Sequence, residues 1–152
     1  MKPATIVAIA ASPALGLGIM AITVAAMILG PRAGGAAALD GGDVWAATLD
    51  EAKARSAESG QPVLAVFSAS WCPPCKSMKA NVYPRAEVVA ELESSWEPVY
   101  IDIDREKQLA SQYNIRAVPS YVLMDADGRE FDRFSGGYPD ANSWINRLNK
   151  KR

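Results

Sequence analysis

The chain has 152 residues, of which 49% are hydrophobic and 22% are charged, and its formal net charge is -1. This length and composition are those of one globular domain with an appended segment. The balanced charge excludes the strongly basic surface on which a nucleic-acid-binding domain depends, so we expect no nucleic-acid partner.

An uncharged stretch begins the chain. No charged residue occurs from Ala4 to Leu29, and this length suffices for a helix that spans a bilayer. The apolar region of a secretory signal peptide is shorter, although Ala36 and Ala38 form the A-x-A pattern at which signal peptidase cuts. We therefore expect residues 1–30 to be an uncleaved membrane anchor, with a cleaved signal peptide as the alternative.

The segment that follows is rich in glycine and alanine. Residues 31–43 have little side-chain surface to bury, so we expect a flexible tether there. Because Lys2 and the amino terminus mark the cytoplasmic side, the domain after the tether, residues 44–152, is expected to lie outside the cytoplasm.

Residues 44–60 predict the first helix of this domain. Trp45, Leu49 and Ala52 share one face of the helix, and the glycine that ends it is a suitable C-terminal cap. The chain then enters a short, continuous apolar run, residues 62–70. Such a run is typical of a central strand that is buried on both faces.

A helical pattern follows the segment that contains both cysteines. Residues 76–95 predict a helix that Pro84 breaks or kinks, because proline lacks an amide hydrogen. Residues 97–104 return to a strand. Residues 105–115 predict a further helix, which Asn114 closes.

The last third of the domain contains a hairpin and a final helix. Residues 120–137 predict two strands joined through Asp127 and Gly128. Residues 140–152 predict a helix with Asp140 as its N-cap. The complete order implies an α/β fold, in which a central mixed sheet has right-handed crossovers first, an antiparallel hairpin last and helices on both faces.

The only two cysteines, Cys72 and Cys75, are separated by Pro73 and Pro74. A structural zinc site needs four ligands, usually cysteine and histidine, and the chain has no histidine, so we expect no metal. A purely structural disulfide across so short a loop contributes only about 2 kcal/mol. The spacing therefore favours a redox-active dithiol, and we expect no cofactor.

The two cysteines are expected to differ in role. If a helix begins at the motif, Cys72 is its N-cap, where unpaired amides and the positive end of the helix dipole stabilise a thiolate. We therefore predict that Cys72 is the nucleophile. Cys75 lies one turn into the helix and is shielded, so we predict that it resolves the mixed disulfide between Cys72 and a substrate.

Three motifs combine with this order of elements. "WCPPCK" stands at a strand-to-helix junction, "AVPS" precedes the penultimate strand, and "DADGRE" lies in the hairpin. Together they resemble the thioredoxin family over residues 44–149. The opening of the domain is most similar to bacterial extracytoplasmic thioredoxin-like domains, including the C-terminal domain of the transmembrane thiol:disulfide interchange proteins.

The resemblance implies a thioredoxin fold and three substrate-binding residues. Trp71 matches a residue that borders the docking surface of the family, and the alternative is a core aromatic. Pro119 matches a cis proline that faces the cysteine pair. Val118 matches the residue that offers its backbone to a bound peptide strand, so recognition is expected to use main-chain pairing.

The sequence departs from the family at two positions. Thioredoxins usually have a buried aspartate before the motif, which assists deprotonation of the second cysteine, and a lysine in the next strand. Val66 and Tyr100 stand at these positions. The proton of the second cysteine must therefore pass to water or to another group, and Glu87, Asp102 and Asp104 are the candidates.

The direction of electron flow depends on how strongly the folded chain stabilises the Cys72 thiolate. Pro73 and Pro74 offer no amide hydrogen, and no imidazole is available, so the stabilisation is expected to be moderate. This favours a reductant of protein disulfides. A disulfide-forming oxidase, and a binding module or chaperone with little turnover, are the alternatives.

A reductant outside the cytoplasm needs electrons from across the membrane. The expected partners are therefore protein thiol and disulfide substrates and a membrane thiol reductant as electron donor. The expected location is the bacterial inner membrane, with a single span over residues 4–29 and the domain facing the periplasm. A soluble periplasmic protein is the alternative.

Overall fold

Residues 44–151 are the part of the chain that the computed structural model describes. The expected anchor, residues 1–30, and the expected tether, residues 31–43, lie outside the described residues. Within the described range, no helix is both long enough and apolar enough to cross a membrane.

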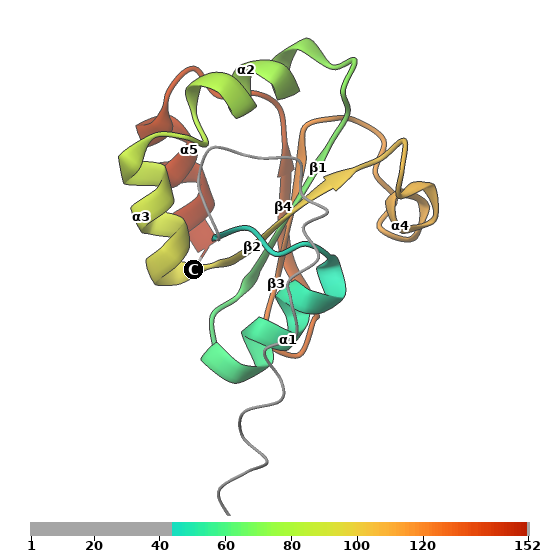
Figure 1. Cartoon of the computed structure of the whole chain (residues 1–152), viewed down its shortest axis with the longest axis vertical. Coiled ribbons are helices and arrows are strands. Elements are labelled where there is room, and N and C mark those ends of the chain that lie inside the picture. Colours follow the sequence, from blue (N-terminus) through green and yellow to red (C-terminus); the bar gives the residue numbers. More distant parts are fainter. Residues whose placement is uncertain (1–43, 152) are drawn as a thin grey trace, which may run out of the picture. The chain divides into compact units, whose positions relative to one another are not determined.

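The elements follow the order that the sequence predicts (Figure 1). The helices are α1 (Leu49–Ser59), α2 (Pro73–Asn81), α3 (Ala86–Ser95), α4 (Lys107–Gln112) and α5 (Ala141–Leu148), and a short 3-10 turn, Asn149–Lys151, follows α5. The strands are β1 (Val63–Ser68), β2 (Glu97–Asp102), β3 (Ser120–Met124) and β4 (Glu130–Ser135). The predicted break at Pro84 separates α2 from α3.

Strand β1 lies inside the sheet, whose strand order is β2-β1-β3-β4. It pairs in parallel with β2 and antiparallel with β3, and β3 and β4 form the antiparallel hairpin. All residues of β1 are buried, as its continuous apolar run predicts. The hairpin turn uses Gly128, whose φ of 76° lies in the left-handed region that favours glycine. The predicted mixed sheet is confirmed.

Helices cover both faces of this sheet (Figure 1). On one face, α2, α3 and α5 contribute Met78, Leu92 and Trp144 to a core. On the other face, Leu49 of α1 packs in a second core, against which Leu109 of α4 lies. The predicted helices on both faces are therefore confirmed, and the fold is α/β.

The start of α1 differs from the prediction, because Trp45 precedes the helix. The helix begins at Leu49, behind an N-cap formed by Thr48. Ala46 instead forms a parallel bridge to Val99 of β2. Trp45 therefore packs in the core under α2, α3 and α5, whereas Leu49 packs in the core on the opposite face.

The two edge strands of the sheet are covered differently. The outer edge of β2 is paired with Ala46, whose N–H donates to the Pro98 carbonyl at 2.8 Å. The outer edge of β4 has no strand partner within residues 44–151. Three of its residues, Glu130, Asp132 and Arg133, carry charge.

Candidate active site at the start of helix α2

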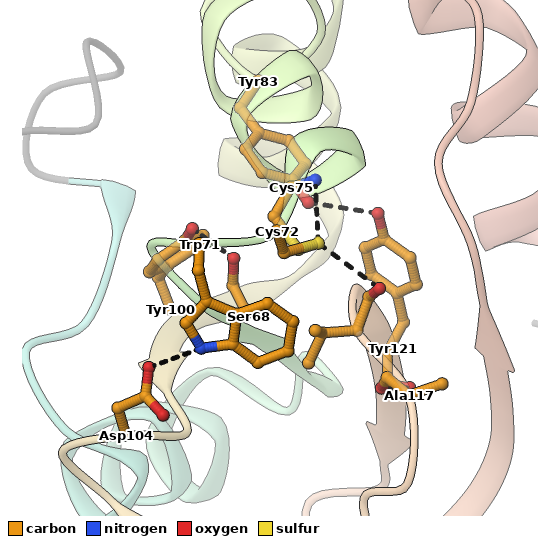
Figure 2. The surroundings of a disulfide bond; sticks show 11 residues. Ser68, Trp71, Cys72, Cys75, Tyr83, Tyr100, Asp104, Ala117 and Tyr121 are labelled. Carbon is orange, nitrogen blue, oxygen red and sulfur yellow. Dashed lines mark hydrogen bonds between the residues drawn. A yellow bond between two sulfur atoms is a disulfide. The ribbon is translucent and has the colours of Figure 1, made fainter.

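Cys72 and Cys75 lie where the buried strand β1 gives way to α2, and they form a disulfide with Cα atoms 5.3 Å apart (Figure 2). Cys72 is the N-cap of α2, as predicted, and the backbone N–H of Cys75 donates to its Sγ at 3.3 Å. Pro73 and Pro74 occupy the first two helical positions. The extended backbone of Cys72 thus places its sulfur beside the first amides of α2.

This position gives the Cys72 sulfur an electropositive environment. The first amides of a helix have no helical acceptor, and they carry the positive end of its dipole. Because Pro73 and Pro74 lack an amide hydrogen, the Cys75 N–H is the first helical amide that reaches the sulfur. No acidic residue in the first turn opposes this field. A thiolate at Cys72 is therefore stabilised mainly by one amide and by the dipole.

Burial does not distinguish the two cysteines. The exposed fraction of Cys72 is 3% and that of Cys75 is 2%, so the shielding expected for Cys75 extends to both residues of the disulfide. Ile103 and Val118 pack against the pair from other segments of the chain. The difference between the cysteines in this form is their place in the helix and their hydrogen bonding.

The Val118-Pro119 peptide bond is cis, as the resemblance implies, and Val118 packs against the cysteine pair. The Val118 carbonyl lies 3.4 Å from Cys72 Sγ (Figure 2). A disulfide sulfur has no proton, so this is a contact in the oxidised form, and the same geometry lets a Cys72 thiol donate to that carbonyl. The Val118 N–H has no partner among the described residues, so it is available to a bound strand.

Trp71 lies at the surface beside the disulfide, and 62% of it is exposed. Its indole N–H donates to Asp104 Oδ2 at 2.9 Å (Figure 2). The alternative of a core aromatic is therefore wrong for Trp71. An exposed ring held by one hydrogen bond has the character of a contact surface for another molecule.

A pair of hydroxyls occupies the sheet below the cysteines. Val66 is fully buried and pairs with Tyr100 in the neighbouring strand. The Tyr100 hydroxyl donates to Ser68 Oγ at 2.5 Å (Figure 2). Burial raises the pKa of Tyr100, the hydrogen bond to Ser68 lowers it and the negative charge of Asp102 raises it, with a net increase. Sequence reasoning missed Ser68, because nothing local indicates a partner in β2.

The three candidate proton acceptors lie in different surroundings. Glu87 is exposed and pairs with Arg85, and a hydrogen bond from its own backbone N–H is the main cause of its lowered pKa. Asp104 is exposed and bound to Trp71. Asp102 is half-buried and lines a groove of about 630 Å³ that also reaches Cys75.

The loop between β4 and α5 completes the rim of the site, and sequence reasoning missed it. The Gly136 N–H donates to the Pro119 carbonyl at 2.9 Å. Gly137 lies so close to α2 that an added Cβ would stand 3.1 Å from Pro74 Cβ. The consecutive glycines after a predicted strand were the available signal, since glycine permits close approach of the backbone.

Within residues 44–151, no group of three or more histidine, cysteine, aspartate or glutamate side chains is arranged to hold a metal ion. The disulfide between Cys72 and Cys75 supports chemistry at its own sulfur atoms. A dithiol at a helix N-terminus, beside an exposed tryptophan and an unpaired backbone amide, can exchange with a disulfide in an extended peptide.

Comparisons with known proteins agree with this geometry. A family model described as a thioredoxin-like domain matches residues 49–152. The chain is 39% identical over 90 residues to the chloroplastic thioredoxin Y2 of Arabidopsis thaliana, which covers 59% of this chain and 51% of that protein. The chain thus spans about half the length of this relative.

Two solved structures share the fold. A DsbH oxidoreductase superimposes with a TM-score of 0.63 at 19% identity, over 70% of this chain and 82% of the other. The C-terminal domain of DsbD from Neisseria meningitidis, in its reduced form, gives 0.57 at 23% identity, over 66% of this chain and 90% of the other. At these identities the likeness establishes the fold, as predicted from the sequence motifs.

Proposed function

The chain belongs to the thioredoxin-like domain family, and from this premise we propose that it is a thiol-disulfide oxidoreductase that reduces protein disulfides outside the cytoplasm through Cys72 and Cys75. One observation carries the assignment of roles. Cys72 is the N-cap of α2, and the amide of Cys75 points at its sulfur. The thiolate is therefore favoured at Cys72, which makes Cys72 the attacking residue.

The exchange has two steps. The Cys72 thiolate attacks one sulfur of the substrate disulfide, that S–S bond breaks, and the other substrate sulfur leaves as a thiolate. The Cys75 thiolate then attacks Cys72 Sγ, and the second substrate sulfur leaves. Two electrons have passed to the substrate, which takes up two protons, and the Cys72-Cys75 disulfide remains. A donor dithiol must reduce this disulfide before the next cycle.

Substrate recognition in this proposal uses Trp71 and Val118. The exposed ring of Trp71 offers apolar contact beside the sulfur, and the Val118 N–H offers a hydrogen bond to an extended peptide. Main-chain pairing selects an extended backbone more than a particular side chain. The proposal therefore includes a range of unfolded or partly folded protein substrates.

Trapping of mixed disulfides tests the roles of the two cysteines. Cys75→Ser removes the resolving thiol, so mixed disulfides with client proteins should accumulate on Cys72. Cys72→Ser removes the attacking thiol and should trap almost none. Equal trapping by the two variants would overturn the assignment. A wild type that binds clients without reducing insulin in the presence of dithiothreitol would favour the binding module instead.

The reducing direction rests on the chemistry of the turn. Pro73 and Pro74 remove two of the amides that stabilise a thiolate, and the chain has no histidine to add a positive charge. Weak stabilisation of the thiolate leaves the disulfide comparatively stable and makes the dithiol a better donor. The expected potential is nearer roughly -270 mV, as in thioredoxin, than roughly -120 mV, as in the strong oxidant of this fold.

Equilibration with glutathione or dithiothreitol buffers measures this potential, with the fraction of disulfide followed by thiol alkylation and mass spectrometry. A value above about -160 mV contradicts the reducing direction and makes the protein an oxidase. The result does not depend on the identity of the client proteins.

The location outside the cytoplasm rests on the uncharged stretch of residues 4–29. We place the electron donor in the same membrane, as a thiol reductant that passes electrons across it. Full-length protein should stay in the membrane pellet after a carbonate wash and keep its N-terminal mass. A soluble protein that begins at Leu39 would instead identify a cleaved signal peptide.

A further inference from the structure

A groove of about 630 Å³ opens below the cysteine pair and connects Cys75 with solvent. Residues of α1, α2, β2 and the loop after β2 line it. Its volume is enough for several water molecules, since one water occupies about 30 Å³ in the liquid. Cys75 itself is 2% exposed, and it is one of the residues that line this groove.

Asp102 lies on the wall of this groove that faces α2. Successive residues of a strand point to opposite faces of the sheet. Tyr100 packs in the core under α2, and Ile101 packs in the core on the other face, so Asp102 points to the α2 side. Asp102 is also the register partner of Ser68, the residue that accepts the Tyr100 hydrogen bond.

The register of β1 and β2 also places the Asp102 carboxylate on the face of the sheet that lies under α2. Val66 and Ser68 point to the α2 face of β1, and Tyr100 and Asp102 point to it from β2. The acid that is missing at Val66 therefore has a counterpart on the adjacent strand, one step nearer the end at which the cysteines lie. Tyr100, whose hydroxyl donates to Ser68, lines the groove together with Asp102.

We propose that Asp102 accepts the proton of Cys75, through water in the groove, when Cys75 resolves the mixed disulfide. This proposal rests on the function proposed above. In the step, the proton leaves Cys75 Sγ for a groove water, and that water passes a proton to the Asp102 carboxylate. The Cys75 sulfur then forms a bond with Cys72 Sγ, the bond from Cys72 to the substrate sulfur breaks, and the substrate sulfur leaves as a thiolate.

Other groups near the cysteines are less suited to this role. Glu87 is paired with Arg85 at the surface, and Asp104 is paired with Trp71. The hydroxyls of Tyr83 and Tyr121 bond to each other at 3.1 Å, and burial raises the pKa of both, so these phenols stay protonated.

Several charged or titratable groups line the groove together with Asp102, and their charges affect the same proton transfer. They are Asp50 from α1, Lys76 and Lys79 from α2, Tyr100 on β2, and Arg105 and Glu106 in the segment after β2. Asp50 belongs to the first turn of α1, so it provides a matched control for a change of charge in the groove.

The experiment follows the two steps separately with dithiobis-nitrobenzoate and the reduced full-length protein. Attack by Cys72 releases one coloured thiolate, and attack by Cys75 on the resulting mixed disulfide releases the second. Asp102→Asn should leave the first step unchanged and slow the second by about tenfold or more near neutral pH. The second-step rates of Asp102→Asn and of the wild type should converge as the pH rises, because hydroxide then removes the proton of Cys75.

The sign of the change separates this role from a purely electrostatic one. A nearby negative charge disfavours a thiolate, so removing a carboxylate that acts only as a charge accelerates the second step. Acceleration by Asp102→Asn therefore overturns the proposal, as does an unchanged rate or an equal slowing by Asp50→Asn. Asp102→Glu keeps a carboxylate and should retain most of the wild-type rate.

Two features of the design keep the result interpretable. Asparagine retains the oxygen that accepts the Asp104 N–H at 2.9 Å, and a first-step rate equal to that of the wild type shows that the surroundings of Cys72 are unchanged. A wild type without a first step contradicts the proposed function as well as this inference. A normal first step with an unaffected second step in Asp102→Asn contradicts the inference alone.

Discussion

The presentation of Trp71 depends on a single polar contact. Its indole N–H donates to Asp104, which stands two residues after the end of β2. Without that bond the ring is free to take other rotamers, and ordering it again on binding costs side-chain entropy. In the proposed function, Asp104 therefore acts as a positioning residue for the surface that meets the substrate.

Removing this contact should weaken substrate binding. Asp104→Ala is expected to raise the KM for a peptide disulfide by about twofold to tenfold, the worth of one hydrogen bond, with little change in kcat. Asp104→Asn keeps an oxygen acceptor and should give a smaller rise. Steady-state kinetics of both variants measure the effect, and an unchanged KM in Asp104→Ala contradicts the positioning role.

At the residue scale, the sequence predicted the features that depend on neighbouring residues. It did not reveal the contacts between residues that lie far apart in the chain. The N-cap position of Cys72 follows from the motif itself, because a proline pair after a cysteine suits the first turn of a helix. The Tyr100-Ser68 hydrogen bond joins residues on two strands, and only the register of β1 and β2 brings them together. The burial of Cys72 likewise depends on Val118, from a distant segment.

At the scale of elements, the loop between β4 and α5 joins three parts of the site. Gly136 bonds to the Pro119 carbonyl, and Gly137 packs against Pro74. The Tyr138 N–H then donates to Met78 Sδ of α2 at 3.2 Å. The loop therefore joins the start of α2 to the segment just before β3, which carries the cis proline.

Substitution of Gly137 should disturb the site through this contact. Gly137→Ala places a Cβ 3.1 Å from Pro74 Cβ, so the first turn of α2 must shift, and disulfide reduction should slow several-fold. Gly60→Ala is the control, because Gly60 has a φ of 74° and nothing within 4 Å of an added Cβ.

The control variant should lose about 1 kcal/mol of stability to backbone strain and keep the wild-type rate. Urea unfolding and insulin reduction measure the two quantities. A normal rate in Gly137→Ala, or an equal loss of rate in both variants, contradicts a direct link between the loop and α2.

The contact between β4 and α5 should make stability depend on pH. Asp132 Oδ2 accepts from Arg147 at 2.9 Å, and only 8% of the Asp132 side chain is exposed. Burial by itself raises the pKa of Asp132, but the hydrogen bond and charge of Arg147 outweigh it, and the net pKa lies below its ordinary value. The carboxylate therefore stabilises the fold above about pH 4, and this stabilisation is lost as the pH falls through the folded-state pKa.

Asp132→Ala is accordingly expected to lower the free energy of unfolding by about 1 to 3 kcal/mol at neutral pH. The difference from the wild type should shrink as the solution is acidified. Urea unfolding at several pH values measures it. Asp127→Ala removes an exposed pair with Arg129 and should have no measurable effect, and a pH-independent difference for Asp132→Ala contradicts the role of the carboxylate.

The first helix shows why element boundaries were harder to predict than element order. Trp45, Leu49 and Ala52 have helical spacing, which placed the start of the helix too early. The backbone at Ala46 pairs with β2 instead, and Thr48 supplies the cap from which the helix begins. Because the β2 partner lies far along the chain, hydrophobic spacing alone does not reveal it.

At the scale of the whole molecule, the site and the expected anchor are separate parts of the chain. Every residue of the candidate site lies within residues 44–151. A chain that begins at Leu39 should therefore keep both steps of thiol exchange at wild-type rates, whereas it should no longer sediment with membranes. Loss of exchange in this shortened chain contradicts the independence of the domain, and continued sedimentation contradicts the anchor.

The uncovered edge of β4 bears on how the protein behaves at high concentration. An unpaired strand edge is a template on which another chain can add, and charged side chains oppose such growth. On β4, Phe131 is 39% exposed, and the exposed charged residues Glu130 and Arg133 lie before and after it in the strand. Among the strands of residues 44–151, β4 therefore combines an unpaired edge with the charged side chains that oppose the addition of another strand.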